Sequence, residues 1–184
     1  MGKGNAYRPL LTVLLMLAVP EFTALSQSAS ANGTKSADEQ DIYAVVIRSQ
    51  MEEWIKSGDK SEAEAKDASD RAIAQRLNFR IFFVEIDGKD PSDDFIKRFA
   101  DVPRTIKKVS EEVPNKGPHQ PIDKSTRRAG IVFSAEHLRW SCSDSVELEG
   151  GYYCGGLCAA GTTYKLRREN GKWVIKSSQM NWIS

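Results

Sequence analysis

The pentapeptide 154–158, Cys-Gly-Gly-Leu-Cys, constrains the fold of this chain more than any other stretch. Runs of alternating polar and apolar residues lie on both sides of it, at 145–149 and 163–167, and such runs are typical of strands. A three-residue hairpin loop needs positive φ, which glycine adopts without steric cost. Residues that flank such a loop lie about 4.5–5.5 Å apart between Cα atoms, which suits a disulfide. We therefore expect a bridge between Cys154 and Cys158 that closes a hairpin.

Other states of the cysteines stay open at this point. Thioredoxin-like redox pairs have two intervening residues and lie at the start of a helix, whereas here there are three and no helical pattern follows. The two thiols could also bind a metal, or both could be unpaired. The third cysteine, Cys142, allows a rival bridge to Cys154 across neighbouring strands. We interpret the 154–158 bridge as structural and expect Cys142 to be free.

The first 31 residues have the pattern of a secretory signal peptide. Positive charges precede an apolar core at 10–19, and Ala29-Ser30-Ala31 fits the small-x-small rule for cleavage. Ten apolar residues are too few to span a bilayer, which needs roughly 20; an uncleaved signal anchor is the alternative. We expect export to the periplasm or the medium, with residues 32–184 as one domain and no membrane span after cleavage.

Charge and motifs narrow the classes of partner and chemistry. The full chain carries 26 Lys and Arg against 25 Asp and Glu, and removal of residues 1–31 makes it neutral. Without a basic block, nucleic acid and anionic membranes are poor partners. The partner itself stays unknown, with a protein, a glycan or a small molecule as the open alternatives. The sequence has no HExxH, CxxC, GxSxG, phosphate-loop or acidic calcium-loop motif. We therefore expect no catalytic residues, no metal and no cofactor.

The first half of the domain is predicted to be mostly helical, with two strands. Ser36 and Glu39 match a capping box, and an amphipathic helix should follow over 38–57, with Gly58 as its stop. Two polar segments are expected as exposed excursions, 61–76 as a solvated helix and 114–127 as a loop. A buried strand at 78–87, a short helix after Asp90 and an exposed strand from Thr105 complete this half.

The second half is continuously β. Strands are expected at 129–135, extended or bent by 136–142, and at 146–154, 162–168 and 172–177. Asn170-Gly171 is a strong hairpin signal, and Gly150-Gly151 indicates a bulge. The predicted fold class is α+β, with a long N-terminal helix packed on an antiparallel sheet that ends in a C-terminal β-meander.

Three groups of residues suggest chemistry, and each also has an ordinary structural explanation. Cys142 and His137 could form a nucleophile and a base, but residues five apart in one strand point to opposite faces unless the strand bends. Glu147 and Glu149 share a strand face at a spacing that suits acid–base catalysis, yet we interpret them as a solvated face. His119 lies in a polar loop, where we expect it to be solvated.

The C-terminal third resembles a group of small, uncharacterised secreted bacterial proteins. The resemblance rests on the CGGLC element at 154–158, on Gly161, on the Gly-Lys-Trp-Val run at 171–174 and on the Trp-Ile-Ser end at 182–184. A Val-Ser-Glu-Glu run after the short helix is also similar. The group brings no established activity, so the resemblance implies no site residues.

Two classes of function fit the sequence. The first is a non-enzymatic exported domain that binds a partner, with Gly155, Gly156 and Leu157 as a candidate binding tip. The alternative is a cone-shaped helix-on-sheet fold like that of the nuclear-transport-factor superfamily. Its pocket would bind a small molecule or act as a hydrolase or isomerase. A pocket with an ionisable residue beneath the N-terminal helix would favour the alternative, and a filled core would favour the first class.

Overall fold

A computed structural model of the chain describes residues 1–2, 36–113 and 119–184. The predicted signal peptide, apart from its first two residues, therefore lies outside the described residues. Lys35–Ser184 forms one compact unit. No helix in the described part is both long and apolar enough to cross a membrane. The elements in chain order are α1 (Ala37–Glu64), α2 (Ala68–Leu77), β1 (Ile81–Ile86), α3 (Asp93–Lys97), β2 (Thr105–Lys108), the 3-10 turn η1 (Val109–Glu111), β3 (Ile131–Cys142), β4 (Ser145–Gly155), β5 (Cys158–Glu169) and β6 (Lys172–Ile183).

Helix α1 begins where the sequence predicts. The Ser36 hydroxyl accepts from the Glu39 N–H, and the Glu39 carboxylate accepts from the Ser36 N–H. This reciprocal pair is the predicted capping box, and it satisfies N–H groups that have no partner within the helix.

The predicted end of α1 at Gly58 is wrong, because the helix continues to Glu64. A Cβ at position 58 would lie 2.7 Å from the side-chain oxygen of Asn78. Asn78 is buried at the end of α2 and donates to Asp59 at 3.0 Å and to Glu62 at 2.5 Å. The glycine therefore allows α1 and the end of α2 to meet, and the expected excursion at 61–76 is divided between these two helices.

The strands form one six-stranded sheet in the order β2-β1-β3-β4-β5-β6. β3 to β6 pair antiparallel as consecutive neighbours, which confirms the C-terminal meander. The prediction of a wholly antiparallel sheet is wrong, because β1 pairs parallel with both β2 and β3. Parallel neighbours need a long crossover, and the segments 87–104, which contains α3, and 109–130 supply two.

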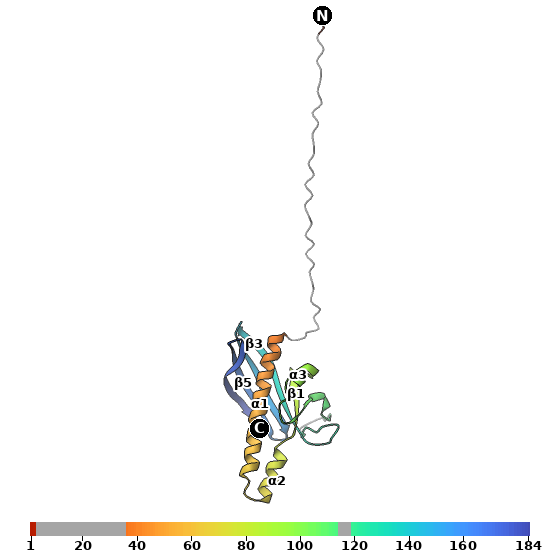
Figure 1. Cartoon of the computed structure of the whole chain (residues 1–184), viewed down its shortest axis with the longest axis vertical. Coiled ribbons are helices and arrows are strands. Elements are labelled where there is room, and N and C mark those ends of the chain that lie inside the picture. The colour runs from red at the N-terminus through yellow and green to blue at the C-terminus, as the bar shows by residue number, and fades with distance from the viewer. Residues whose placement is uncertain (3–35, 114–118) are drawn as a thin grey trace. The chain divides into compact units, whose positions relative to one another are not determined.

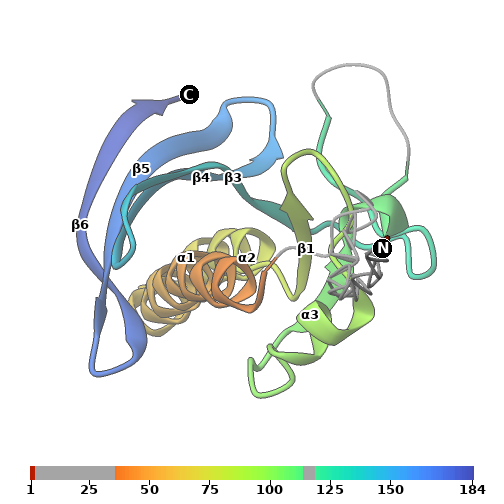
Figure 2. The ribbon, with the colours of Figure 1, turned by 90° about the horizontal axis from the view of Figure 1, so that it is seen from above.

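Helix α1 lies against one face of the sheet, which curves around it, and α2 packs beside the far end of α1 (Figures 1 and 2). The space between α1 and the strands is filled by apolar side chains that are 1% exposed or less, among them Val46, Met51, Phe82, Phe133 and Leu148. A Cβ at Gly150 would collide with Gln50 and approach Val46 of α1.

The prediction of a bulge at Gly150-Gly151 is also wrong. The β4–β5 register runs without a shift from Glu149 to Tyr153. The absence of a side chain at Gly150 instead allows α1 to lie close to β4.

The hairpin tip between β4 and β5 carries the two cysteines. The Cα atoms of Cys154 and Cys158 lie 5.2 Å apart, and their sulfur atoms are within disulfide distance. Gly155 and Gly156 both have positive φ, as the tight loop requires. Leu157 is 88% exposed. Cys142 is free and exposed, with its Sγ 2.9 Å from a carboxylate oxygen of Asp144.

Candidate functional site

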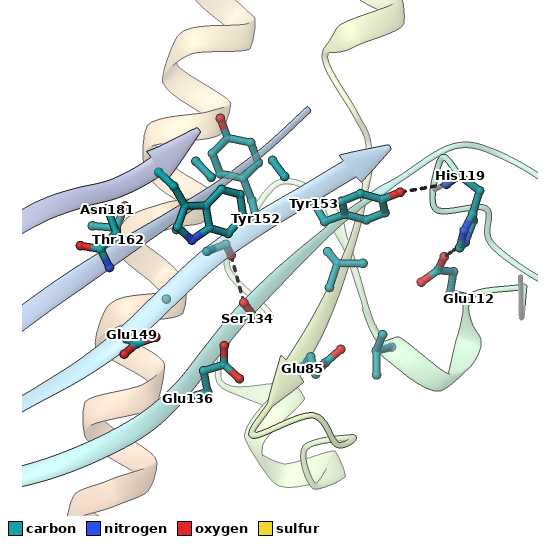
Figure 3. A pocket seen from close by; sticks show the side chains of 18 residues that line it. Glu85, Glu112, His119, Ser134, Glu136, Glu149, Tyr152, Tyr153, Thr162 and Asn181 are labelled. Atoms are coloured by element: carbon teal, nitrogen blue, oxygen red, sulfur yellow. Dashed lines mark hydrogen bonds and ion pairs between the residues drawn. The ribbon is translucent and has the colours of Figure 1, made fainter. Parts of the chain in front are cut away.

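A hollow of about 350 Å³ lies on the outer face of the sheet, which we define as the face turned away from α1. Figure 3 shows side chains around it from β1, β3 and β4 and from the segment that carries His119. The hollow extends from η1 and the segment before β3 at one side to the end of β6 at the other.

Strand register brings the acidic residues of the hollow together. Glu85 of β1 lies opposite Ser134 of β3, and Glu136, two residues further along β3, lies opposite Glu149 of β4. Residues directly opposite each other in a sheet, and residues two apart in one strand, share a face. The three carboxylates, which come from three strands, therefore lie on the same outer face (Figure 3).

Glycines form the floor of the hollow. Gly151 of β4 lies opposite Gly161 of β5. A Cβ at Gly151 would collide with the carbonyl oxygen of Ala160, and a Cβ at Gly161 would collide with the indole ring of Trp182. The indole therefore lies directly over the backbone of Gly161. Because Trp182 is 54% exposed, it presents much of its surface as a wall of the hollow.

The side chains that line the hollow carry an excess of negative charge. Glu85, Glu112, Glu136 and Glu149 line it, and none of its lining residues, all taken from the described part of the chain, is Lys or Arg. Burial raises the pKa of Glu85, and the negative charges of Glu136, Glu112 and Asp90 raise it further. A cleft lined by charges of one sign concentrates counter-ions, so this hollow attracts cations.

His119 forms part of the rim, and the expectation that it is merely solvated is wrong. Its Nε2 lies 2.7 Å from a carboxylate oxygen of Glu112, and its backbone N–H donates to the Tyr153 hydroxyl at 2.8 Å (Figure 3). Tyr153 also packs on the buried side chains of Ile81, Phe83 and Val132, which belong to the outer face. These contacts fix the segment around His119 against the sheet.

β3 bends at His137. The β3–β4 register shifts between Glu136 and Arg139, and His137 has a φ of 56°. Its Nδ1 lies 3.4 Å from Oε2 of Glu149, while Arg139 donates to Oε1 of the same carboxylate at 3.2 Å. From the sequence, such a bend was the one way in which the side chains of His137 and Cys142 could lie on the same face of the strand. In the structure His137 lies beside Glu149, and the thiol of Cys142 lies beside Asp144.

Glu147 and Glu149 share the outer face, as the alternation predicts, but their surroundings differ. Glu147 lies 3.5 Å from the ammonium group of Lys165, opposite it on β5, at the solvated part of the sheet. Glu149 lines the hollow. Glu85, Glu136 and Trp182 were not among the candidate site residues predicted from the sequence. A Glu within the apolar run 79–86 was the available signal, because a charged side chain in a buried strand needs a specific environment.

The space that a cone-shaped fold would use lies beneath α1, and along the middle of the helix the described side chains are packed. At the start of α1 a cavity of about 410 Å³ is lined by Glu39 and Tyr43 of the helix, by Asp87 and by His137, Leu138 and Trp140 of β3. At the far end of α1 a separate cavity of about 270 Å³ lies between α1, α2 and the hairpin tip, lined by Trp54, Phe79 and Cys158 among others. None of its lining residues is ionisable. Ionisable side chains therefore line the hollow on the outer face and the cavity at the start of α1, but not the cavity at its far end.

Comparisons with protein-family models, with curated proteins and with solved structures found no match. The resemblance of the C-terminal third to small secreted bacterial proteins therefore stays a prediction.

Proposed function

We propose that this protein is an exported, non-enzymatic binding domain and that the hollow on its outer face holds a small organic cation. One observation carries the proposal: four carboxylates line the hollow, and no Lys or Arg is among the described residues that line it. Arg139, outside the hollow, pairs with one of them, Glu149. Export rests on the predicted signal peptide at 1–31, and a cysteine pair at disulfide distance is compatible with it.

The charge of the hollow is local. The chain as a whole has a net charge of +1, so the acidic hollow does not follow from overall composition. Ammonium and guanidinium groups form charge-assisted hydrogen bonds with carboxylates, and guanidinium does so with two parallel bonds. Glu136 and Glu149, opposite each other on β3 and β4, provide the carboxylates for such a group.

The walls suit the apolar part of the same ligand. Trp182 and Tyr153 present aromatic surface, and Val132 lies beside Tyr153. Aromatic faces attract cations by about 0.5–2 kcal/mol, and the methylene groups of a short alkyl chain gain by contact with apolar surface. The ligand that fits best is therefore a guanidinium or ammonium group on a short alkyl chain, such as a basic side chain or a small amine.

A second candidate is acid–base hydrolysis, and the raised pKa of Glu85 favours it. A half-buried carboxyl beside a second carboxylate, here Glu136, is the arrangement of several hydrolases. In this candidate the acid and base are Glu85 and Glu136 on the outer face, whereas the sequence-based alternative placed the active site beneath the N-terminal helix. It predicts turnover of a ligand, whereas the binding proposal predicts that the ligand is recovered unchanged.

Calorimetric titration with butylguanidine and with butylurea, its uncharged isostere, tests the binding proposal. We expect butylguanidine to bind, with an affinity that falls as salt is added, and butylurea to bind at least tenfold more weakly. Glu136→Gln should weaken butylguanidine binding by a similar factor, because it removes a lining charge. Glu147→Gln, a change on the same face but outside the hollow, is the matched control. Equal affinity for both compounds, or equal affinity of both variants, contradicts the proposal.

A further inference from the structure

The bend in β3 changes the direction of one side chain. In a regular strand Glu136 and His137 would point to opposite faces of the sheet. At the bend, the φ of 56° at His137 and the shift in register turn the imidazole so that Nδ1 reaches Glu149. Glu149 itself lies opposite Glu136. Bulges commonly redirect side chains in this way next to functional sites.

The three side chains have the spacing of metal ligands. Each offers one ligand atom, and these atoms all lie within 4.8 Å of one another. Metal–ligand bonds of about 2.0–2.2 Å place two ligands of a tetrahedral zinc ion about 3.4 Å apart. The distance from Nδ1 of His137 to Oε2 of Glu149 is 3.4 Å, so these two atoms already have the required separation.

Hydrogen bonds from neighbouring residues orient two of the three side chains, those of His137 and Glu149. Arg139 binds Oε1 of Glu149, which directs Oε2 toward His137. Asp87 accepts from the backbone N–H of His137 at 3.1 Å, and the Tyr43 hydroxyl donates to Asp87 at 3.2 Å. Hydrogen bonds of this kind orient the ligands of metal sites.

The pairing of the two carboxylates also points to a cation. Glu136 and Glu149 lie directly opposite each other in the β3–β4 ladder. Like charges in this position destabilise a sheet. Arg139 offsets the charge of Glu149, and a dication bound to both carboxylates would also offset that of Glu136.

We propose that Glu136, His137 and Glu149 form a binding site for a first-row divalent metal ion, with Zn²⁺ as the probe that fits its ligands best. One imidazole nitrogen and two carboxylate oxygens would bind the ion and leave a further position for water. The site depends on His137, which does not line the hollow, so the inference goes beyond the proposed binding of an organic cation.

Zinc titration of the purified chain tests the site. Cys142→Ser is the background, because an exposed thiolate is a rival ligand. His137→Gly removes the imidazole at a position where glycine adopts the required φ freely. We expect it to weaken Zn²⁺ binding at least tenfold, and Glu149→Gln to do the same. Glu147→Gln, two residues away on the same face, should leave the affinity unchanged.

The chain has only two histidines, so the ring signals in an NMR spectrum give a second readout. Zn²⁺ should shift the ring signals of His137 and leave those of His119 in place. Failure of Zn²⁺ to bind, equal affinity in His137→Gly, or a shift of His119 alone overturns the inference. Since butylguanidine is titrated in the absence of metal, a protein that binds butylguanidine but no Zn²⁺ refutes the metal site and leaves the proposed function intact.

Discussion

At the scale of single residues, Glu85 has the least ordinary environment. It is a half-buried carboxyl between fully buried neighbours of β1, and it faces other carboxylates across the hollow. Burial raises its pKa above the ordinary value of 4.5, with Glu136, Glu112 and Asp90 adding to the effect. The native state therefore binds this proton more readily than the unfolded state does. Ionised Glu85 lowers the stability of the fold, and this unfavourable contribution disappears as pH falls through the native pKa toward 4.5.

We expect Glu85→Gln to raise the free energy of unfolding near neutral pH, because the amide needs no ionisation in the hollow. The advantage over wild type should shrink as pH falls toward 4.5, where the wild-type carboxyl becomes protonated in both states. Urea unfolding at a series of pH values measures the difference. Glu147→Gln, on the solvated part of the same face, should show no such trend. A wild type that is more stable than Glu85→Gln near pH 8 would refute this explanation.

Side-chain alternation predicts which residues of one strand share a face, and it placed Glu147 and Glu149 correctly. It does not predict which strand lies beside which. Glu85 and Glu136 come from strands separated by more than forty residues of chain, and their meeting depends on the parallel β1–β3 register. Trp182 reaches the hollow because Gly161 lies beneath its ring. Such encounters depend on tertiary pairing, which local pattern does not encode.

At the scale of elements, the two ends of α1 differ in how far the sequence predicts them. The capping box is a local interaction of residues three apart, so it can be read directly from Ser36 and Glu39. Gly58 has the residue type of a helix stop, but its surroundings are set by Asn78, twenty residues away in the chain. A distant contact therefore decides whether this glycine ends the helix or only permits packing.

Gly58→Ala tests this explanation because two effects oppose each other. Alanine favours the helix by about 1 kcal/mol relative to glycine, whereas an added methyl group in a packed site costs about 1–3 kcal/mol. Asn78 is 2% exposed and is held by Asp59, Glu62 and Arg104, so it has no room to move away.

We therefore expect Gly58→Ala to lower the free energy of unfolding by about 1 kcal/mol, measured by urea denaturation. Lys60→Ala, an exposed change in the same turn, should stay within about 0.5 kcal/mol of wild type. A Gly58→Ala protein more stable than wild type would indicate that helix propensity outweighs the contact with Asn78.

The sequence left a bend of β3 open within 136–142, and the structure places it at His137. Nothing in residues 136–142 themselves fixes that position. The φ of 56° at His137 is a conformation that few non-glycine residues adopt. In the structure it is supported by Asp87, which follows β1 and accepts from the His137 N–H. The support comes from a different part of the chain, so a local reading cannot locate the bend.

At the scale of the whole molecule, the fold class and the meander follow from sequence, because alternation and Asn170-Gly171 specify consecutive hairpins locally. The parallel pairing of β1 with β2 and β3 cannot be predicted from the sequence in this way. Residues 87–104 can return the chain to the sheet beside β1 in either direction, and packing of α3 against the core selects one. The acidic hollow follows from this topology, since it needs β1, β3 and β4 side by side.

The central claim is that the hollow, and not the hairpin tip, is the binding surface. Amide and indole NMR signals of the labelled protein, recorded while butylguanidine is added, test it most directly. Binding in the hollow should shift the amide signals of Gly151 and Gly161 and the indole N–H of Trp182, while those of Gly156 and Leu157 stay in place. Shifts at Gly156 and Leu157 with an unchanged Trp182 indole signal would contradict the claim and move the binding surface to the tip.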